Sequence, residues 1–153
     1  MLLGRALHRA LEWLGDPGPQ QRAADRPAAC RAALAEQGLP GAQAALLLRW
    51  VTAIVDGPHT AHFFRGPGLR WAGSEVTLAH AGRMLRLDRL VELADADGAA
   101  VWWVLDFKLE QAPHEVPAYR EQLARYRAAV QALQPLARVR AAFVTAEGAL
   151  IEP

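Results

Sequence analysis

The sequence predicts an α/β domain in which a mixed sheet of αβββαβ order is flanked by helices, with extra helices at the N-terminus. Three observations lead to this prediction. Apolar residues recur at helical spacing over the first 55 residues, and residues 75–110 hold three strand-like segments joined by short turns. A segment of helix length then precedes a last strand. Because a connection that contains a helix can join parallel strands, we expect the last strand to run parallel to one of the three.

Three helices are expected before residue 60. Leucines at three- and four-residue steps predict an amphipathic helix over residues 3–14, and the run GDPGPQ ends it. A segment rich in alanine and arginine predicts a second helix over residues 21–37, which GLPG ends. A third helix is expected over residues 42–55, where an apolar stripe precedes DGPHT.

The second half of the chain has the pattern of a sheet. Residues 63–73 are rich in glycine and proline, which indicates a loop or an edge hairpin and not a central strand. The short connections AG and DADGA are typical hairpin turns. The predicted elements are three strands, one helix and a last strand, over residues 75–80, 83–93, 99–110, 116–133 and 139–145.

The length of 153 residues indicates one domain with a core of its own. We expect a single domain over residues 1–153, with a helical part at about 1–57 and a sheet core at about 60–153. Helical patterning starts at the first residues. This start is expected of the C-terminal domain of a longer chain and equally of a small complete protein.

Composition excludes several classes of protein. Cys30 is the one cysteine, so neither a disulfide framework nor a four-cysteine zinc or iron–sulfur site can form within this chain. The net charge of +1 does not indicate a general polyanion binder, so contact with nucleic acid would depend on local arginine clusters. No apolar run reaches the roughly 18 residues of a membrane span. Charged residues interrupt the short apolar start, so we expect no signal peptide, no membrane partner and a cytoplasmic location.

The segment VWWVLDFKLE, residues 101–110, places an acid and an amine in the most apolar predicted strand. Because side chains alternate along a strand, Asp106 and Lys108 share one face with Trp102 and Val104. The opposite face is wholly apolar and is expected in the core; its residues are Val101, Trp103, Leu105, Phe107 and Leu109. If the preceding strand pairs through the hairpin, a shift of a residue or two brings Asp88 beside Asp106.

Such charges need partners, because an isolated buried carboxylate or ammonium costs several kcal/mol. One interpretation is a structural salt bridge from Lys108 to Asp106 or to Asp88. The other is a metal site, since two carboxylates suit a hard divalent cation such as Mg²⁺ or Mn²⁺. The lysine would then face water and a substrate phosphate. The charge pattern alone leaves both interpretations open.

Four sequence motifs together resemble one family. RLDRL followed by VLDFK resembles the PD-(D/E)XK nuclease core, in which an aspartate precedes (D/E)-X-K on the next strand. GRALHRALEWLG, residues 4–15, resembles the helix that opens the nuclease domain of RecB- and AddA-like helicase–nucleases, and YREQLARYRAAV, residues 119–130, is similar to the helix after the lysine. VRAAFVTAEGALIEP resembles their closing strand. The matches follow the family's order over nearly all of the chain, with residues 16–60 least diagnostic, and imply a restriction-endonuclease-like fold.

The resemblance also implies a set of site residues. The implied ligands of a divalent metal are His8, Asp88, Asp106 and the backbone carbonyl of Phe107, and the implied catalytic residues are Asp88, Asp106 and Lys108. Gln122 and Tyr126 are the motif residues of the following helix. With Tyr119 they can share a helix face, from which they would contact DNA or brace the catalytic strand.

The implied activity is that of a metal-dependent deoxyribonuclease. Mg²⁺ is the expected cofactor, Mn²⁺ is expected to substitute, and an iron–sulfur cluster is excluded because the branches that hold one need four cysteines. The cation would polarise a phosphodiester oxygen and lower the pKa of its bound water, while Lys108 would orient that water or offset charge on phosphorus.

The implied role is the exonuclease module of a helicase–nuclease for DNA recombination and repair. Its substrate would be single-stranded DNA ends, delivered by a superfamily 1 helicase in cis or in trans. The sequence has no Walker A pattern, so a motor would lie elsewhere.

Two other functions remain open. A catalytically inactive nuclease fold could bind DNA or a helicase partner, although the presence of every implied ligand and of the lysine favours catalysis. A nuclease of different specificity, such as an endonuclease or a junction resolvase, would carry the same core residues.

Two residues near the implied site differ in their expected roles. Arg86 stands where this family often has a glycine, and its side chain would either bind phosphate or crowd the metal. Glu75 begins a predicted strand where relatives often carry an acid, and we expect it to be a solvated strand-end residue and not a ligand.

Overall fold

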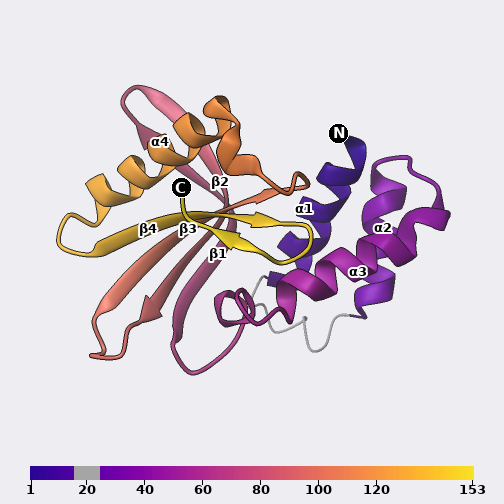
Figure 1. The fold of residues 1–153 in the computed structure, drawn as a ribbon, viewed down its shortest axis with the longest axis horizontal. Helices are drawn as coiled ribbons and strands as arrows, with labels where there is room; N and C mark the ends of the chain where they lie inside the picture. The colour runs from indigo at the N-terminus through magenta and orange to yellow at the C-terminus, as the bar shows by residue number, and fades with distance from the viewer. Residues whose placement is uncertain (16–24) are drawn as a thin grey trace.

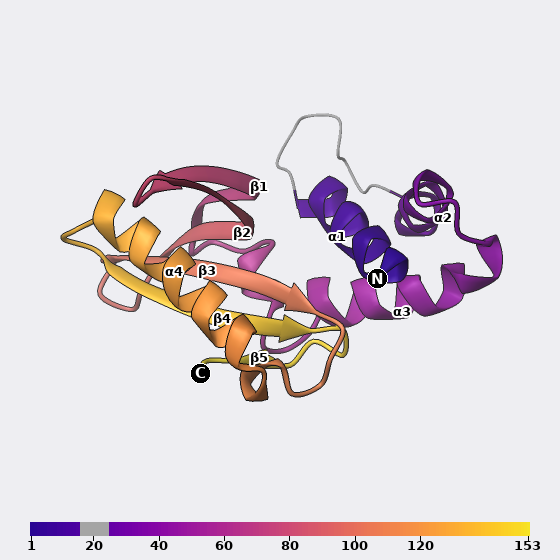
Figure 2. The same cartoon turned by 90° about the horizontal axis from the view of Figure 1, so that it is seen from above.

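A five-stranded mixed sheet with helices on both faces forms the fold in the computed structural model, which describes residues 1–15 and 25–153 (Figures 1 and 2). The helices are α1 (Leu2–Gly15), α2 (Arg26–Glu36), α3 (Ala44–Val55) and α4 (Pro117–Leu133), with short 3₁₀ helices η1 (Gly41–Gln43), η2 (Ala61–Phe63) and η3 (Pro113–Glu115). The strands are β1 (Leu69–His80), β2 (Arg83–Ala94), β3 (Ala100–Lys108), β4 (Arg138–Thr145) and β5 (Leu150–Ile151). The predicted fold class is confirmed.

The strand order is β1-β2-β3-β4-β5, and β3 and β4 are parallel while the other neighbours are antiparallel. The parallel pair follows from α4, which connects β3 to β4 and lies along one face of the sheet (Figure 2). The crossover predicted from the sequence is therefore confirmed.

The helical part follows the sequence pattern with small shifts. Asp25 caps α2 by accepting a hydrogen bond from the backbone N–H of Ala28, and Pro27 stands in the first turn, where its missing N–H costs little. The start of the third predicted helix is the 3₁₀ turn η1. Residues 16–24, which hold most of the predicted stop of the first helix and the predicted start of the second, lie outside the described residues.

The β1–β2 hairpin is longer than predicted. β1 begins at Leu69, so residues 69–73 belong to an edge strand, with a register irregularity between Leu69 and Trp71. The turn Ala81–Gly82 has positive φ at both residues, 48° and 73°, as a two-residue hairpin of type I′ requires. The short strand β5, which pairs with the end of β4, was not predicted.

Two apolar clusters cover the two faces of the sheet. Helices α1, α2 and α3 pack against the face that carries Val101, Trp103, Leu105 and Phe107, so the predicted apolar face of this strand is in the core. On the other face, α4 packs Leu123 and Val130 onto Leu90, Val104 and Phe143, among others. No helix in the described part of the chain combines the length and apolar character needed to cross a membrane.

A buried arginine on β2 ties α1 to the sheet. The Arg89 guanidinium donates to the carbonyl oxygen of Phe63 at 2.9 and 3.1 Å, to that of Gly15 at 3.1 Å and to Ser74 Oγ at 3.0 Å. A Cβ at Gly15 would lie 2.3 Å from Arg89 Nη1, so a larger residue there would displace the guanidinium from its present position. Arg89 thereby fixes where α1 crosses the end of the sheet.

Arg89→Met should lower the free energy of unfolding by about 3 kcal/mol, because the carbonyl groups of Phe63 and Gly15 would lose their donors in a buried place. Urea denaturation followed by circular dichroism measures this change. Arg83→Met, at an exposed position on the same strand, is the matched control and should change stability by less than about 0.5 kcal/mol. Equal losses in the two variants would contradict this role of Arg89.

Candidate active site

Asp88 lies where the ladder between β2 and β3 ends. The last pair in the described register is Arg89 with Leu105, and the next residues in that register are Asp88 and Asp106. The backbone N–H of Phe107 donates at 2.8 Å to Asp88 Oδ2, so a side chain takes the place of the next backbone acceptor. The two strands separate here, and the aspartates lie side by side as the sequence predicted.

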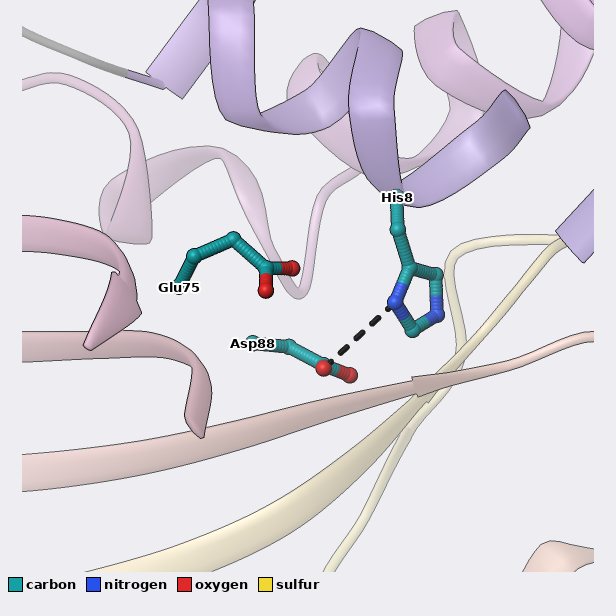
Figure 3. A group of neighbouring side chains, drawn as sticks. All are labelled: His8, Glu75 and Asp88. Atoms are coloured by element: carbon teal, nitrogen blue, oxygen red, sulfur yellow. Dashed lines mark ion pairs between the residues drawn. The ribbon is translucent and has the colours of Figure 1, made fainter. Parts of the chain in front are cut away.

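His8 comes to the same place from α1. Its Nε2 lies 3.1 Å from the carbonyl oxygen of Phe107, and its Nδ1 lies 3.4 Å from Asp88 Oδ1. Figure 3 shows the ring pointing from the helix toward Asp88. An imidazole, a backbone carbonyl and a carboxylate from three separate elements therefore converge, although His8 lies 80 positions before Asp88 and 99 before Phe107 in sequence.

Glu75 is a third acid at this position, and the expectation that it is a solvated strand-end residue is wrong. It lies within β1, its side chain is 24% exposed, and its φ of 52° is left-handed, a conformation that non-glycine residues rarely adopt. Its carboxylate is turned toward the space between His8 and Asp88 (Figure 3). One potential ligand atom from each of these three residues lies within 4.8 Å of the others.

A signal for Glu75 was present in the sequence. A two-residue turn at Ala81–Gly82 pairs His80 with Arg83, and counting back along both strands places Glu75 opposite Asp88. The predicted hairpin therefore already implied this neighbour. What the sequence did not show was the left-handed backbone at Glu75, which sets the direction of its side chain.

Asp106 and Lys108 form an ion pair on the α4 side of the sheet. Lys108 Nζ lies 2.9 Å from Asp106 Oδ2, and Asp106 is 2% exposed. The ammonium also lies 3.4 Å from Gln122 Oε1 and 4.6 Å from the centre of the Tyr119 ring. The structural salt bridge and the cluster of acids thus exist together, and neither interpretation of the sequence excludes the other.

Helix α4 brings the predicted motif residues to the lysine. Gln122 Nε2 donates to the Tyr126 hydroxyl at 2.9 Å, which leaves Gln122 Oε1 directed at Lys108. The Tyr119 hydroxyl donates to Glu110 at 3.0 Å. These contacts hold the lysine between the aspartate and the helix, so the helix braces the end of β3.

The two aspartates have opposite pKa shifts. Burial, and then the neighbouring charge of Asp88, raise the pKa of Asp106 to about 7. Burial also acts against ionisation of Asp88, but its contacts with His8, Asp106 and the Phe107 N–H together outweigh burial and lower its pKa. Of the two carboxyl groups, Asp88 is therefore the one that ionises first, and Asp106 loses its proton only near neutral pH.

The pKa values of the two basic groups, His8 and Lys108, are both raised. Burial alone would lower the pKa of His8, but its hydrogen bond and charge interaction with Asp88 raise it. Likewise, the Asp106 charge outweighs the burial of Lys108 and raises the pKa of the ammonium. For Glu75, burial raises the pKa of the carboxyl.

This group of residues has the chemistry of a divalent-cation site. Asp88 and Glu75 supply carboxylate oxygens, His8 supplies an imidazole nitrogen, and the Phe107 carbonyl is near. Hard cations such as Mg²⁺ and Mn²⁺ prefer oxygen ligands and accept imidazole. Asp106, predicted as a ligand, adjoins Asp88 but is engaged with Lys108, while Glu75 was not predicted and belongs to the group.

Comparison with models of known protein families identifies the family of this chain. The model of the PD-(D/E)XK nuclease superfamily matches residues 2–152, which is nearly the whole chain. The chain therefore belongs to this superfamily, whose members are generally nucleases. No curated protein sequence gives a significant match.

The buried acid predicts a pH-dependent stability. Because the folded-state pKa of Asp106 is raised to about 7, the unfolded chain releases this proton first, and stability falls as pH rises from about 4 to about 7. Asp106→Asn cannot ionise. Without divalent cation, its gain in unfolding free energy over the natural chain should therefore be larger at pH 8 than at pH 5, by about 2–3 kcal/mol. Urea unfolding in EDTA at the two pH values measures the difference. The same gain at both pH values would contradict the shift.

Proposed function

We propose that this protein is a divalent-cation-dependent deoxyribonuclease that hydrolyses phosphodiester bonds. The observation that supports this best is the convergence of His8, Asp88 and Glu75 beside an Asp106–Lys108 ion pair in a superfamily of nucleases. A cluster of acids alone would be common on any protein surface. Here the acids are partly or fully buried, and Lys108 lies next to Asp106 at the end of β3.

In this proposal His8, Asp88, Glu75 and the Phe107 carbonyl hold Mg²⁺ or Mn²⁺, and Asp106 completes the site from β3. When bound, the cation supplies Lewis acidity toward the phosphate and lowers the pKa of its bound water. Asp106 holds the Lys108 ammonium at the edge of the site, where it can donate to a non-bridging oxygen as charge develops on it. Gln122 and Tyr126 fix the direction of Lys108 from α4.

Two residues beside this group suit contact with a nucleic-acid strand. Arg86 is 74% exposed beside Glu75, and the ring of Tyr119 lies against the Lys108 ammonium. A guanidinium can pair with phosphate, and an aromatic ring can stack on a base. We assign Arg86 and Tyr119 to substrate contact on this basis.

We further propose the biological setting that the helix motifs at residues 4–15 and 119–130 imply by resemblance. The protein would be a single nuclease domain, alone or as the C-terminal domain of a longer chain. It would act as an exonuclease on single-stranded DNA ends, together with a superfamily 1 helicase in cis or in trans. Its role would be in DNA recombination and repair in the cytoplasm.

Lys108→Ala should lower the rate of DNA cleavage at least about 100-fold, because the strand end would lose the cation that offsets charge on the phosphate. The assay follows end-labelled single- and double-stranded DNA with Mg²⁺, with Mn²⁺ and with EDTA. Arg138→Ala, exposed at the start of β4, is the control that should retain cleavage.

Cleavage that continues in EDTA, or at an unchanged rate in Lys108→Ala, would contradict the proposed mechanism. If the natural chain binds DNA but cleaves none of these substrates with either cation, the binding module without catalysis becomes the better description.

A further inference from the structure

The Glu75 carboxylate belongs both to an ion pair with Arg86 and to the proposed cation site. Its Oε2 lies 2.8 Å from Arg86 Nε, and a carboxylate oxygen of the same residue belongs to the group with His8 and Asp88. Figure 3 shows this carboxylate turned toward His8 and Asp88. A divalent cation in the group would therefore compete with the Arg86 guanidinium for Glu75.

We propose that Arg86 is an internal counter-ion that occupies Glu75 until a divalent cation takes this carboxylate, and that the released guanidinium then pairs with a phosphate of the bound strand. The inference rests on the proposed function and concerns how its site is controlled. In this proposal, binding of the cation and binding of the nucleic acid depend on each other through Arg86. This is a different role from that of a residue that only crowds the metal.

The strand geometry favours such an exchange. Arg86 and Asp88 are two residues apart on β2 and share a face, and Arg86 stands opposite Thr77, two positions from Glu75 on β1. The guanidinium thus reaches Glu75 diagonally across the hairpin, a contact that long side chains can make. A small rotation about the bonds of the exposed Arg86 side chain would move the guanidinium from the Glu75 carboxylate to a phosphate of a bound strand.

Arg86 is much more exposed than Glu75, and this difference favours replacement of the arginine by a cation at the carboxylate. The Arg86 side chain is 74% exposed and that of Glu75 is 24% exposed, so the ion pair is largely solvated on the arginine side. Pairs of this kind are weak, and water readily replaces the carboxylate at the guanidinium. A divalent cation held by two further groups binds the less exposed carboxylate more strongly, so the cation displaces the arginine.

Coupling of this kind is reciprocal. If the cation releases Arg86 and so raises the affinity for nucleic acid, then nucleic acid that binds Arg86 must raise the affinity for the cation by the same factor. Without nucleic acid, Arg86 lowers the affinity for the cation. The site would therefore fill with metal most readily when a strand is present.

A double-mutant cycle on Mn²⁺ affinity tests this inference without nucleic acid or catalysis. Isothermal titration calorimetry would compare the natural chain, Arg86→Gln, Glu75→Gln and the double variant at one salt concentration. Arg86→Gln should tighten Mn²⁺ binding about three- to tenfold, by removing the competitor for Glu75. In the Glu75→Gln background the same change should alter affinity less than about twofold.

The control for loss of a positive charge is Arg83→Gln, on the same strand and exposed. It should alter Mn²⁺ affinity less than about twofold in either background. A second measurement uses fluorescence anisotropy of a labelled single-stranded oligonucleotide with the Lys108→Ala protein, which should not cleave it. Mn²⁺ should increase the oligonucleotide affinity of the Lys108→Ala protein by a larger factor than that of the Lys108→Ala, Arg86→Gln double variant.

The outcomes separate this inference from the proposed function. Unchanged Mn²⁺ affinity in Arg86→Gln, or an equal tightening in the Glu75→Gln background, would overturn the exchange while the metal site stands. If neither the natural chain nor Arg86→Gln binds Mn²⁺, the result would instead contradict the metal site itself, and with it the proposed function.

Discussion

The Asp88 carboxylate joins three elements of the fold at one point. One oxygen accepts the Phe107 N–H of β3, the other lies against His8 of α1, and the residue itself belongs to β2. The sheet can separate at this place without leaving a backbone donor unpaired, because the side chain supplies the acceptor. The opening between β2 and β3, and the approach of α1 to it, both depend on this contact. Arg89, the next residue, holds α1 from the opposite face of the strand.

Electrostatics explain why the most apolar strand carries an acid and an amine. Asp88 and Asp106 are too close to be ionised together at low cost, and burial adds to this cost for both. His8 and Lys108 offset the charge in the structure as it stands, each beside one of the acids. Asp88 and Glu75 also place two carboxylates beside the His8 ring, a set of donor atoms that suits a divalent cation.

The sequence was sufficient for the four helices, the first four strands and their order, because apolar spacing, hairpin turns and one crossover helix determine them, but it did not predict β5. It also placed Asp88 beside Asp106, since a hairpin allows few registers. It was insufficient for Glu75 and Arg89. The direction of Glu75 depends on a left-handed backbone at a residue other than glycine, and the burial of Arg89 depends on carbonyl groups at Gly15 and Phe63, which are distant in sequence. Such contacts arise only from the packed tertiary structure.

Anomalous scattering from crystals soaked in Mn²⁺ would locate the cation itself. We expect a peak that has the His8 nitrogen and oxygens of Asp88 and Glu75 at about 2–2.5 Å, with Lys108 still beside Asp106. A peak bound by other residues, or a His8 ring that remains on the Phe107 carbonyl with no peak at saturating Mn²⁺, would contradict this expectation.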